Sequence, residues 1–232
     1  MRKPLYACAM TSLAHWQPVL LQAATDSTDT DAAHDTAHLL RVWGTAQQLL
    51  LDHPAADALV VLAACMLHDC VNLPKNHPQR AQASGMAADK AVPLLRALAF
   101  PEDKLPAVAH AIAAHSFSAG IAPRTLEAQI VQDADRLDAL GPVGIARMFS
   151  VGGQLGRALA HPTDPLGSHR PLDDMGYTLD HIEVKLATLP ASMQTAAGRR
   201  LGEERMAWIR AFRADFVKQW LGHSAQLHQP AA

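Results

Sequence analysis

The sequence is poor in several features that mark whole classes of protein. Aromatic residues make up only 5% of the 232 residues, and β-branched residues do not gather into alternating runs, which argues against an extended β-sheet. The three cysteines, Cys8, Cys65 and Cys70, form no C-x-x-C pair, so neither a disulfide framework nor a thiolate zinc site is indicated. A reducing, cytoplasmic setting is the expectation that follows.

Strong net charge and long apolar segments are also missing. The net charge is -2, and no basic stretch with interleaved aromatic residues is present, which argues against nucleic acid as a partner. No segment approaches the roughly 18 consecutive apolar residues of a membrane helix, and Pro4 and Tyr6 interrupt the short apolar start. We therefore expect no membrane association and a small soluble substrate; whether the chain forms a homodimer is left open.

Alanine and leucine are abundant, and both favour helices. Apolar residues at helical spacing, separated by Pro, Gly and polar breaks, predict one all-α domain over residues 1–232. The break at 161–171 is long enough to be either a mobile loop or one that serves a site. The expected helices cover residues 11–24, 34–51, 55–70, 81–99, 102–116, 124–140, 142–160, 178–189 and 194–221.

The most informative feature is the pair His68-Asp69 at the end of a run that is apolar almost all round. An ionisable pair that emerges from a buried helix is costly unless something compensates it, and a metal ion would do so. His38 offers an imidazole on the preceding helix, and Asp135 offers a carboxylate in the later run IVQDADRLDAL. Three helices are therefore expected to converge on one divalent cation.

A donor set of two imidazoles and two carboxylates contains no thiolate. It suits Mn²⁺ or Mg²⁺, with Co²⁺, Ni²⁺ and Fe²⁺ as alternatives, better than structural Zn²⁺. Four protein ligands on a six-coordinate ion leave positions for a phosphate oxygen and for a water whose pKa the ion lowers. The set is therefore suited to hydrolysis.

Three motifs in this order resemble those of the HD-domain superfamily, and within it the small stand-alone bacterial HD proteins. They are D-x-x-H-x-x-R-V at 35–42, L-H-D at Leu67, His68 and Asp69, and D-A-D-R-L-D-A at 133–139, with further similar segments at 75–80 and 114–119. The resemblance implies an all-α helical bundle of the HD type that hydrolyses phosphate or pyrophosphate bonds, often in nucleotides. It also implies metal ligands at His38, His68, Asp69 and Asp135.

Asp135 is preferred over Asp133 as the fourth ligand. Asp135 is followed by a basic residue and then L-D, as in the D-[KR]-x-D pattern of the superfamily, whereas Asp133 lies about 200° away around the helix. The metal-binding core is then expected at about 30–145, with C-terminal helices at 146–222 packed on it and a flexible tail at 223–232.

Further residues are candidates for catalysis and for substrate binding. Asp69 and His115 are the catalytic candidates, with His115 as a general acid, although His115 also suits a helix C-terminus as a cation. With His110 it would offer a second metal site, but the two lie about 140° apart on one helix, which favours a single ion. Phosphate is expected to bind Lys75, His77, Arg80 and Arg136, unless the first three lie in a solvated loop and Arg136 pairs with Asp133.

The sequence thus predicts a divalent-metal-dependent phosphohydrolase that uses a metal-activated water on a small phosphorylated substrate, with a nucleotide favoured. Some HD nucleotidases carry an acidic residue where this chain has Asn72, so the base is Asp69 or the metal-activated water itself. Two alternatives stay open: a metal-binding regulatory or scaffold protein without turnover, and a di-iron oxygenase.

Overall fold

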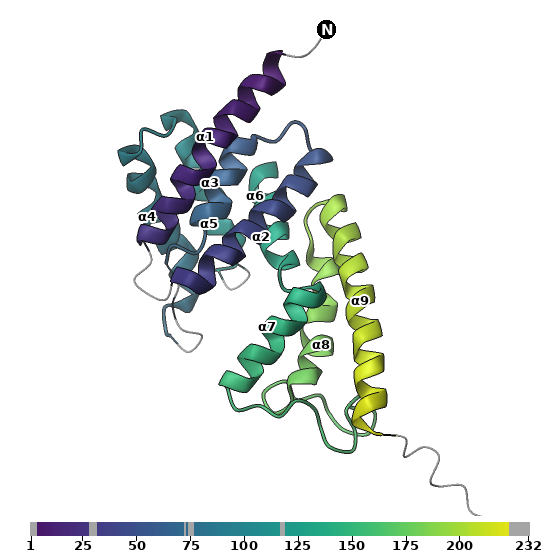
Figure 1. Ribbon diagram of the computed structural model, residues 1–232. Helices are drawn as coiled ribbons and strands as arrows, with labels where there is room; N and C mark the ends of the chain where they lie inside the picture. The colour runs from purple at the N-terminus through teal and green to yellow at the C-terminus, as the bar shows by residue number, and fades with distance from the viewer. Residues whose placement is uncertain (1–3, 28–31, 72, 74–76, 117–118, 223–232) are drawn as a thin grey trace, which may run out of the picture. The chain divides into compact units, whose positions relative to one another are not determined.

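The computed structural model describes residues 4–27, 32–71, 73, 77–116 and 119–222 (Figure 1). These residues form helices joined by turns, and the only strand-like pairing among them is one isolated bridge between Ala158 and Tyr177. The all-α prediction is therefore confirmed. None of the helices in the described ranges is long and apolar enough to cross a membrane.

The chain divides into two compact units, Met1–Asp135 and Arg136–Ala232, with the division inside the last turn of one helix. The single-domain organisation of residues 1–232 stays a prediction, and the tail expected at 223–232 lies outside the described residues. The helices of the first unit are α1 (Pro4–Ser27), α2 (Ala32–Leu51), α3 (Ala58–Leu67), α4 (Ala83–Ala97), α5 (Leu105–His115) and most of α6 (Leu126–Leu137).

Helix α3 lies at the centre of the first unit and contacts α1, α2, α4 and α5. Nine of its ten residues are buried, because apolar side chains occupy every face of the helix. Burial of each large aliphatic side chain contributes about 1.5–3 kcal/mol. The helix is therefore held firmly at the place where His68 and Asp69 follow it.

The start of α3 is fixed by the side chain of Asp57. Its carboxylate accepts hydrogen bonds from the amides of Leu59 and Val60, as an N-cap should, and it forms an ion pair with Lys104. The amide of Asp57 in turn donates to Oε1 of Glu127, 2.9 Å away. The N-terminus of α3 is thus tied to the segment before α5 and to α6.

The second unit contains α7 (Gly141–Gln154), α8 (His181–Val184) and α9 (Ala196–Trp220), with short 3-10 turns at Thr178–Asp180, Leu186–Thr188 and Pro190–Ser192. The helix expected over 142–160 was too long. It ends at Gln154 because Gly156, with φ +68°, closes it, and the amide of Arg157 donates back to the carbonyl of Gly152 at 2.9 Å.

The single helix expected over 178–189 was also wrong, since α8 has only four residues between 3-10 turns. The hydroxyl of Thr188 donates to the carbonyl of Lys185 at 2.8 Å, so a side chain competes with the helical hydrogen bonds. Pro190 follows and cannot donate a helical hydrogen bond. Local competition therefore outweighs the apolar spacing in this segment.

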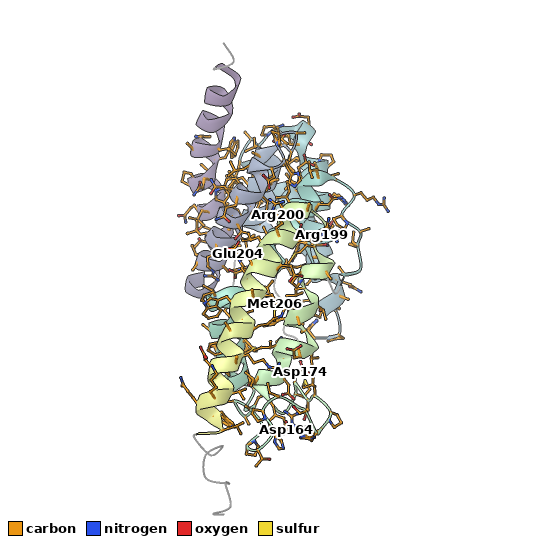
Figure 2. All side chains as sticks on the ribbon, turned by 90° about the vertical axis from the view of Figure 1, so that its right-hand side faces the viewer. Asp164, Asp174, Arg199, Arg200, Glu204 and Met206 are labelled. Carbon is orange, nitrogen blue, oxygen red and sulfur yellow. The ribbon has the colours of Figure 1, made fainter. Side chains whose placement is uncertain are left out.

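The long connection before α8 is held by a buried ion pair. The two terminal nitrogens of the Arg170 guanidinium donate to the two oxygens of Asp180, at 2.6 and 2.8 Å, and the Asp180 side chain has no exposed surface. The guanidinium also lies 4.7 Å from the ring centroid of Tyr177. This connection is thus an ordered element of the second unit. Figure 2 shows Asp164 and Asp174 in it, and Arg199, Arg200, Glu204 and Met206 along α9.

Candidate metal centre

His38 reaches the site from α2. Leu39, Val42 and Trp43 are buried on the same helix, and their burial fixes which face of α2 turns inward. The His38 side chain is only 8% exposed, so its imidazole is held within the protein. An inward-facing imidazole on an otherwise apolar face needs a polar partner.

His68 and Asp69 follow α3 directly. The Nδ1 of His68 lies 2.9 Å from the carbonyl oxygen of Cys65, one turn earlier, and donates to it. A neutral His68 therefore carries its lone pair on Nε2, which is the arrangement usual for metal-ligating histidines. The side chain of Asp69 is partly exposed, so this carboxylate also borders solvent.

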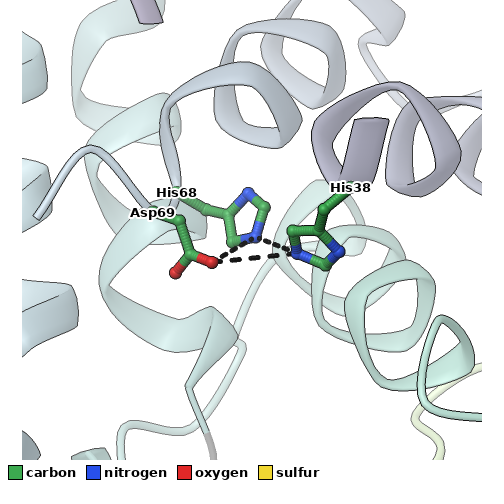
Figure 3. A group of neighbouring side chains, drawn as sticks. All are labelled: His38, His68 and Asp69. Atoms are coloured by element: carbon green, nitrogen blue, oxygen red, sulfur yellow. Dashed lines mark hydrogen bonds and ion pairs between the residues drawn. The ribbon is translucent and has the colours of Figure 1, made fainter. Parts of the chain in front are cut away.

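These three side chains converge on one point (Figure 3). The Nε2 atoms of His38 and His68 are 3.2 Å apart. Oδ2 of Asp69 lies 3.8 Å from Nε2 of His38 and 3.6 Å from Nε2 of His68. Two imidazole nitrogens and a carboxylate oxygen thus face one another across a distance that a shared cation would bridge.

Asp135 joins this group from α6. Its Oδ1 lies 3.4 Å from Nε2 of His38 and 3.7 Å from Nε2 of His68. Burial alone would raise the pKa of the Asp135 carboxyl, but its hydrogen bond with His38 and the charges of the neighbouring histidines hold that pKa well below the usual range. Asp133 is fully buried and is not among the residues that meet the two imidazoles.

His115 completes the cluster from the last residue of α5. Its Nδ1 lies 2.6 Å from the carbonyl oxygen of Ile112, and its Nε2 lies 3.7 Å from Oδ1 of Asp69. The rings of His68 and His115 meet edge to face at 4.8 Å. Burial, and then the charge of His68, lower the pKa of His115, while the carboxylates of Asp135 and Asp69 oppose that shift.

The donor set fits a divalent cation. In the described part of the chain, His38, His68 and Asp69 offer ligand atoms within 4.8 Å of one another, and so do His68, His115 and Asp135. Two carboxylates can balance a double positive charge, and the neutral imidazoles add nitrogen ligands. Neither group includes a cysteine, and burial, and then Asp135, raise the pKa of the Cys65 thiol far above its usual value.

Comparison with known proteins places this cluster in a family. A family model described as the HD domain matches residues 36–140, which include the residues of the cluster. The Bacillus subtilis protein YpgQ is 30% identical over 196 residues, which cover 83% of this chain and 85% of YpgQ. The chain belongs to the HD-domain family.

Solved structures of HD-domain proteins share the fold. A crystal structure of an HD-superfamily hydrolase from Bacillus thuringiensis has a TM-score of 0.69 at 29% identity, over 89% of this chain and 97% of that one. The structure of Bacillus subtilis YpgQ in complex with ADP has a TM-score of 0.64 at 27% identity, over 87% and 95% of the two chains. The predicted HD-type fold is confirmed, and these relatives support a metal-dependent hydrolase.

The residues predicted to bind substrate lie in different surroundings. Arg80 lines a small recess with Asp69 and His115, and its guanidinium also donates to the carbonyl of Leu73. The ring of His77 accepts a hydrogen bond from the amide of Gln79 in its own turn, at 3.1 Å. Lys75 lies outside the described residues, as does Asn72.

The other two basic or imidazole candidates are engaged elsewhere. Arg136, the first residue of the second unit, donates to the carbonyl and hydroxyl oxygens of Ser192, at 2.7 and 3.2 Å. His110 accepts a hydrogen bond from the amide of Arg124 at 3.0 Å. Substrate binding by Arg136 stays a prediction, and His110 is in neither group of candidate metal ligands in the described part of the chain.

Two polar residues that support the cluster were not identified from the sequence. Ser84 on α4 and Gln132 on α6 are each 2% exposed, and both donate to carbonyls at the end of α5. Gln132 lies one turn before Asp135, so its position three residues before that candidate ligand was a usable signal. Ser84 stands in a run of alanines and carries no comparable signal.

Proposed function

We propose that this HD-domain protein is a divalent-metal-dependent phosphohydrolase that cleaves phosphate or pyrophosphate bonds in a small phosphorylated substrate. One observation carries the proposal: Nε2 of His38 lies 3.2 Å from Nε2 of His68, and carboxylate oxygens of Asp69 and Asp135 lie 3.4–3.8 Å from these two nitrogens. We assign these four residues as the ligands of one ion, with Mn²⁺ or Mg²⁺ favoured. A divalent ion would supply polarisation of a phosphate oxygen and acidification of a water.

The protein's own groups supply proton transfer. Asp69 is partly exposed and borders the recess, so it can take the proton of an attacking water. His115 has its Nδ1 fixed on a backbone carbonyl, which leaves Nε2 as the nitrogen that gives a proton to the leaving oxygen. Anionic phosphate beside the ring would act as the two carboxylates do and favour its charged form.

Arg80 is assigned to phosphate binding. It lies in the same recess as Asp69 and His115, where a guanidinium can neutralise charge that develops on a phosphoryl group. A nucleotide is the favoured substrate because the relative YpgQ has been crystallised in complex with ADP. Lys75, His77 and Arg136 remain candidates for further phosphate contacts.

The test is a hydrolysis screen of nucleoside tri-, di- and monophosphates with Mn²⁺, Mg²⁺, Co²⁺ or Ni²⁺, in which orthophosphate and pyrophosphate are measured separately. Turnover should stop with a chelator and return when metal is added back. His68→Ala and Asp69→Ala should abolish turnover while helical content stays near wild type. Asp89→Ala, the same change at an exposed carboxylate on α4, is the matched control and should retain activity.

Two outcomes would replace the proposal. Tight metal binding without turnover on any of these substrates would support a regulatory or scaffold protein. Two irons per chain by elemental analysis would support an oxygenase. Full turnover by Asp69→Ala would reject the assignment of the site.

A further inference from the structure

The last turn of α5, which ends at His115, is held by three side chains. The final carbonyls of a helix have no amide partner within the helix. Here the carbonyls of residues 112–114 accept hydrogen bonds from Nδ1 of His115, from the hydroxyl of Ser84 and from Nε2 of Gln132, at 2.6, 2.9 and 2.7 Å. Each of three consecutive carbonyls therefore has a side-chain donor, and two of the donors come from other helices.

Gln132 links α5 to the helix that carries Asp135. It is three residues before Asp135, which places both side chains on the same face of α6. Its Nε2 donates to the carbonyl of Ala114, the residue before His115, while its Oε1 is buried without a hydrogen-bond partner among the described residues. A buried unsatisfied acceptor costs about 1–3 kcal/mol, which offsets most of what one hydrogen bond contributes to stability. Folding stability alone does not account for a glutamine here.

Ser84 makes the corresponding link from α4. Its hydroxyl donates to the carbonyl of Ala113, and Ser84 lines the same recess as Asp69, Arg80 and His115. Helices α4 and α5 pack against each other. Hydrogen bonds from α4 and from α6 thus hold the end of α5 at the position where His115 meets Asp69.

We propose that Gln132 and Ser84 are positioning residues that fix the imidazole of His115 against Asp69. Neither has to touch the substrate. The predicted effect of these two residues on catalysis rests on the proposed function, whereas their predicted effect on the end of α5 does not. Displacement of a reacting group by about 1 Å can cost about 100-fold in rate, so a frayed helix end would reduce turnover.

The test compares Gln132→Met, which keeps the shape but removes the donor, with Ser84→Ala and their double variant. Gln129→Met is the matched control, because Gln129 is on the same helix and its amide donates to the carbonyl of Pro123, at 3.4 Å, rather than to α5. Hydrogen–deuterium exchange should become faster in peptides that cover 108–116 in all three variants. Exchange in α2 and α3 should be unchanged, and the control should match wild type.

In the hydrolysis assay, Gln132→Met should lower kcat about 10–100-fold, the range found for residues that orient ligands, while KM and Mn²⁺ affinity stay within about threefold. The thermal midpoint should move by only a few degrees. Unchanged exchange at 108–116 would overturn the proposal, and so would a lowered thermal midpoint with kcat intact, which is what a merely structural role predicts. If wild type shows no turnover, the proposed function fails, and the exchange experiment still decides the inference.

Discussion

Replacement of Asp135 by asparagine tests which of the two aspartates in the segment D-A-D at 133–135 binds the metal. Asp135 approaches Nε2 of both His38 and His68, whereas Asp133 is fully buried and lies outside the cluster. Asp135→Asn keeps the size of the side chain and removes one of the two negative charges among the four donors. The variant should therefore bind the metal ion more weakly than wild type does.

The expected loss of metal affinity follows from the short distances between Asp135 and the two imidazoles. Replacement of a residue that only orients metal ligands typically lowers metal affinity or activity by about 10–100-fold. A carboxylate 3.4 Å from one imidazole nitrogen and 3.7 Å from the other is placed to be a ligand itself. Its replacement should weaken binding by at least about 100-fold, which corresponds to about 2.7 kcal/mol.

The assay is titration of metal-stripped protein with Mn²⁺ by calorimetry, with Asp133→Asn as the matched control. Because the Asp133 side chain is buried elsewhere, the control should bind Mn²⁺ within about threefold of wild type, although its free energy of unfolding falls. Weak binding by Asp133→Asn together with full affinity in Asp135→Asn would refute the assignment of the fourth ligand.

Two further variants test the recess and the second unit. Arg80→Ala should raise KM for a phosphorylated substrate about 10-fold and leave Mn²⁺ affinity unchanged, because it removes a charge-assisted contact with phosphate. The control Arg124→Ala, at an exposed arginine, should leave KM unchanged. An unaltered KM in Arg80→Ala would exclude the contact between Arg80 and phosphate. Asp180→Ala removes the carboxylate that accepts two hydrogen bonds from the Arg170 guanidinium and one from the amide of Asp173, so it should lower the thermal midpoint by about 5 °C. The control Asp215→Ala, at an exposed carboxylate, should change the thermal midpoint by less than about 2 °C, as is usual for surface substitutions. Equal shifts of the midpoint in the two variants would contradict a stabilising role for the pair Arg170–Asp180.

The elements that the sequence predicts well are those whose signal is local. Helix α3 was predictable because apolar residues fill all its faces, and the pair His68-Asp69 was conspicuous at the end of that run. The choice of Asp135 over Asp133 came from helix geometry together with the superfamily pattern. The structure brings Asp135, and not Asp133, to the two imidazoles.

The features that the sequence missed depend on tertiary contacts. The segment 178–189 has the apolar spacing of a helix, but a threonine hydroxyl and a following proline break it into short turns. Ser84 and Gln132 donate to carbonyls of another helix, and the only sequence signal for either contact is the spacing of Gln132 from Asp135. The contact of Arg136 with Ser192, 56 residues away, is equally invisible in the sequence.

The most direct test of the site is an X-ray structure of crystals grown with Mn²⁺, with anomalous differences measured at a wavelength where manganese scatters strongly. We expect one anomalous peak in the described part of the chain, within coordination distance of Nε2 of His38 and His68 and of carboxylate oxygens of Asp69 and Asp135. Absence of a peak there, or a peak held by other side chains, would contradict the assignment of this cluster as the metal centre.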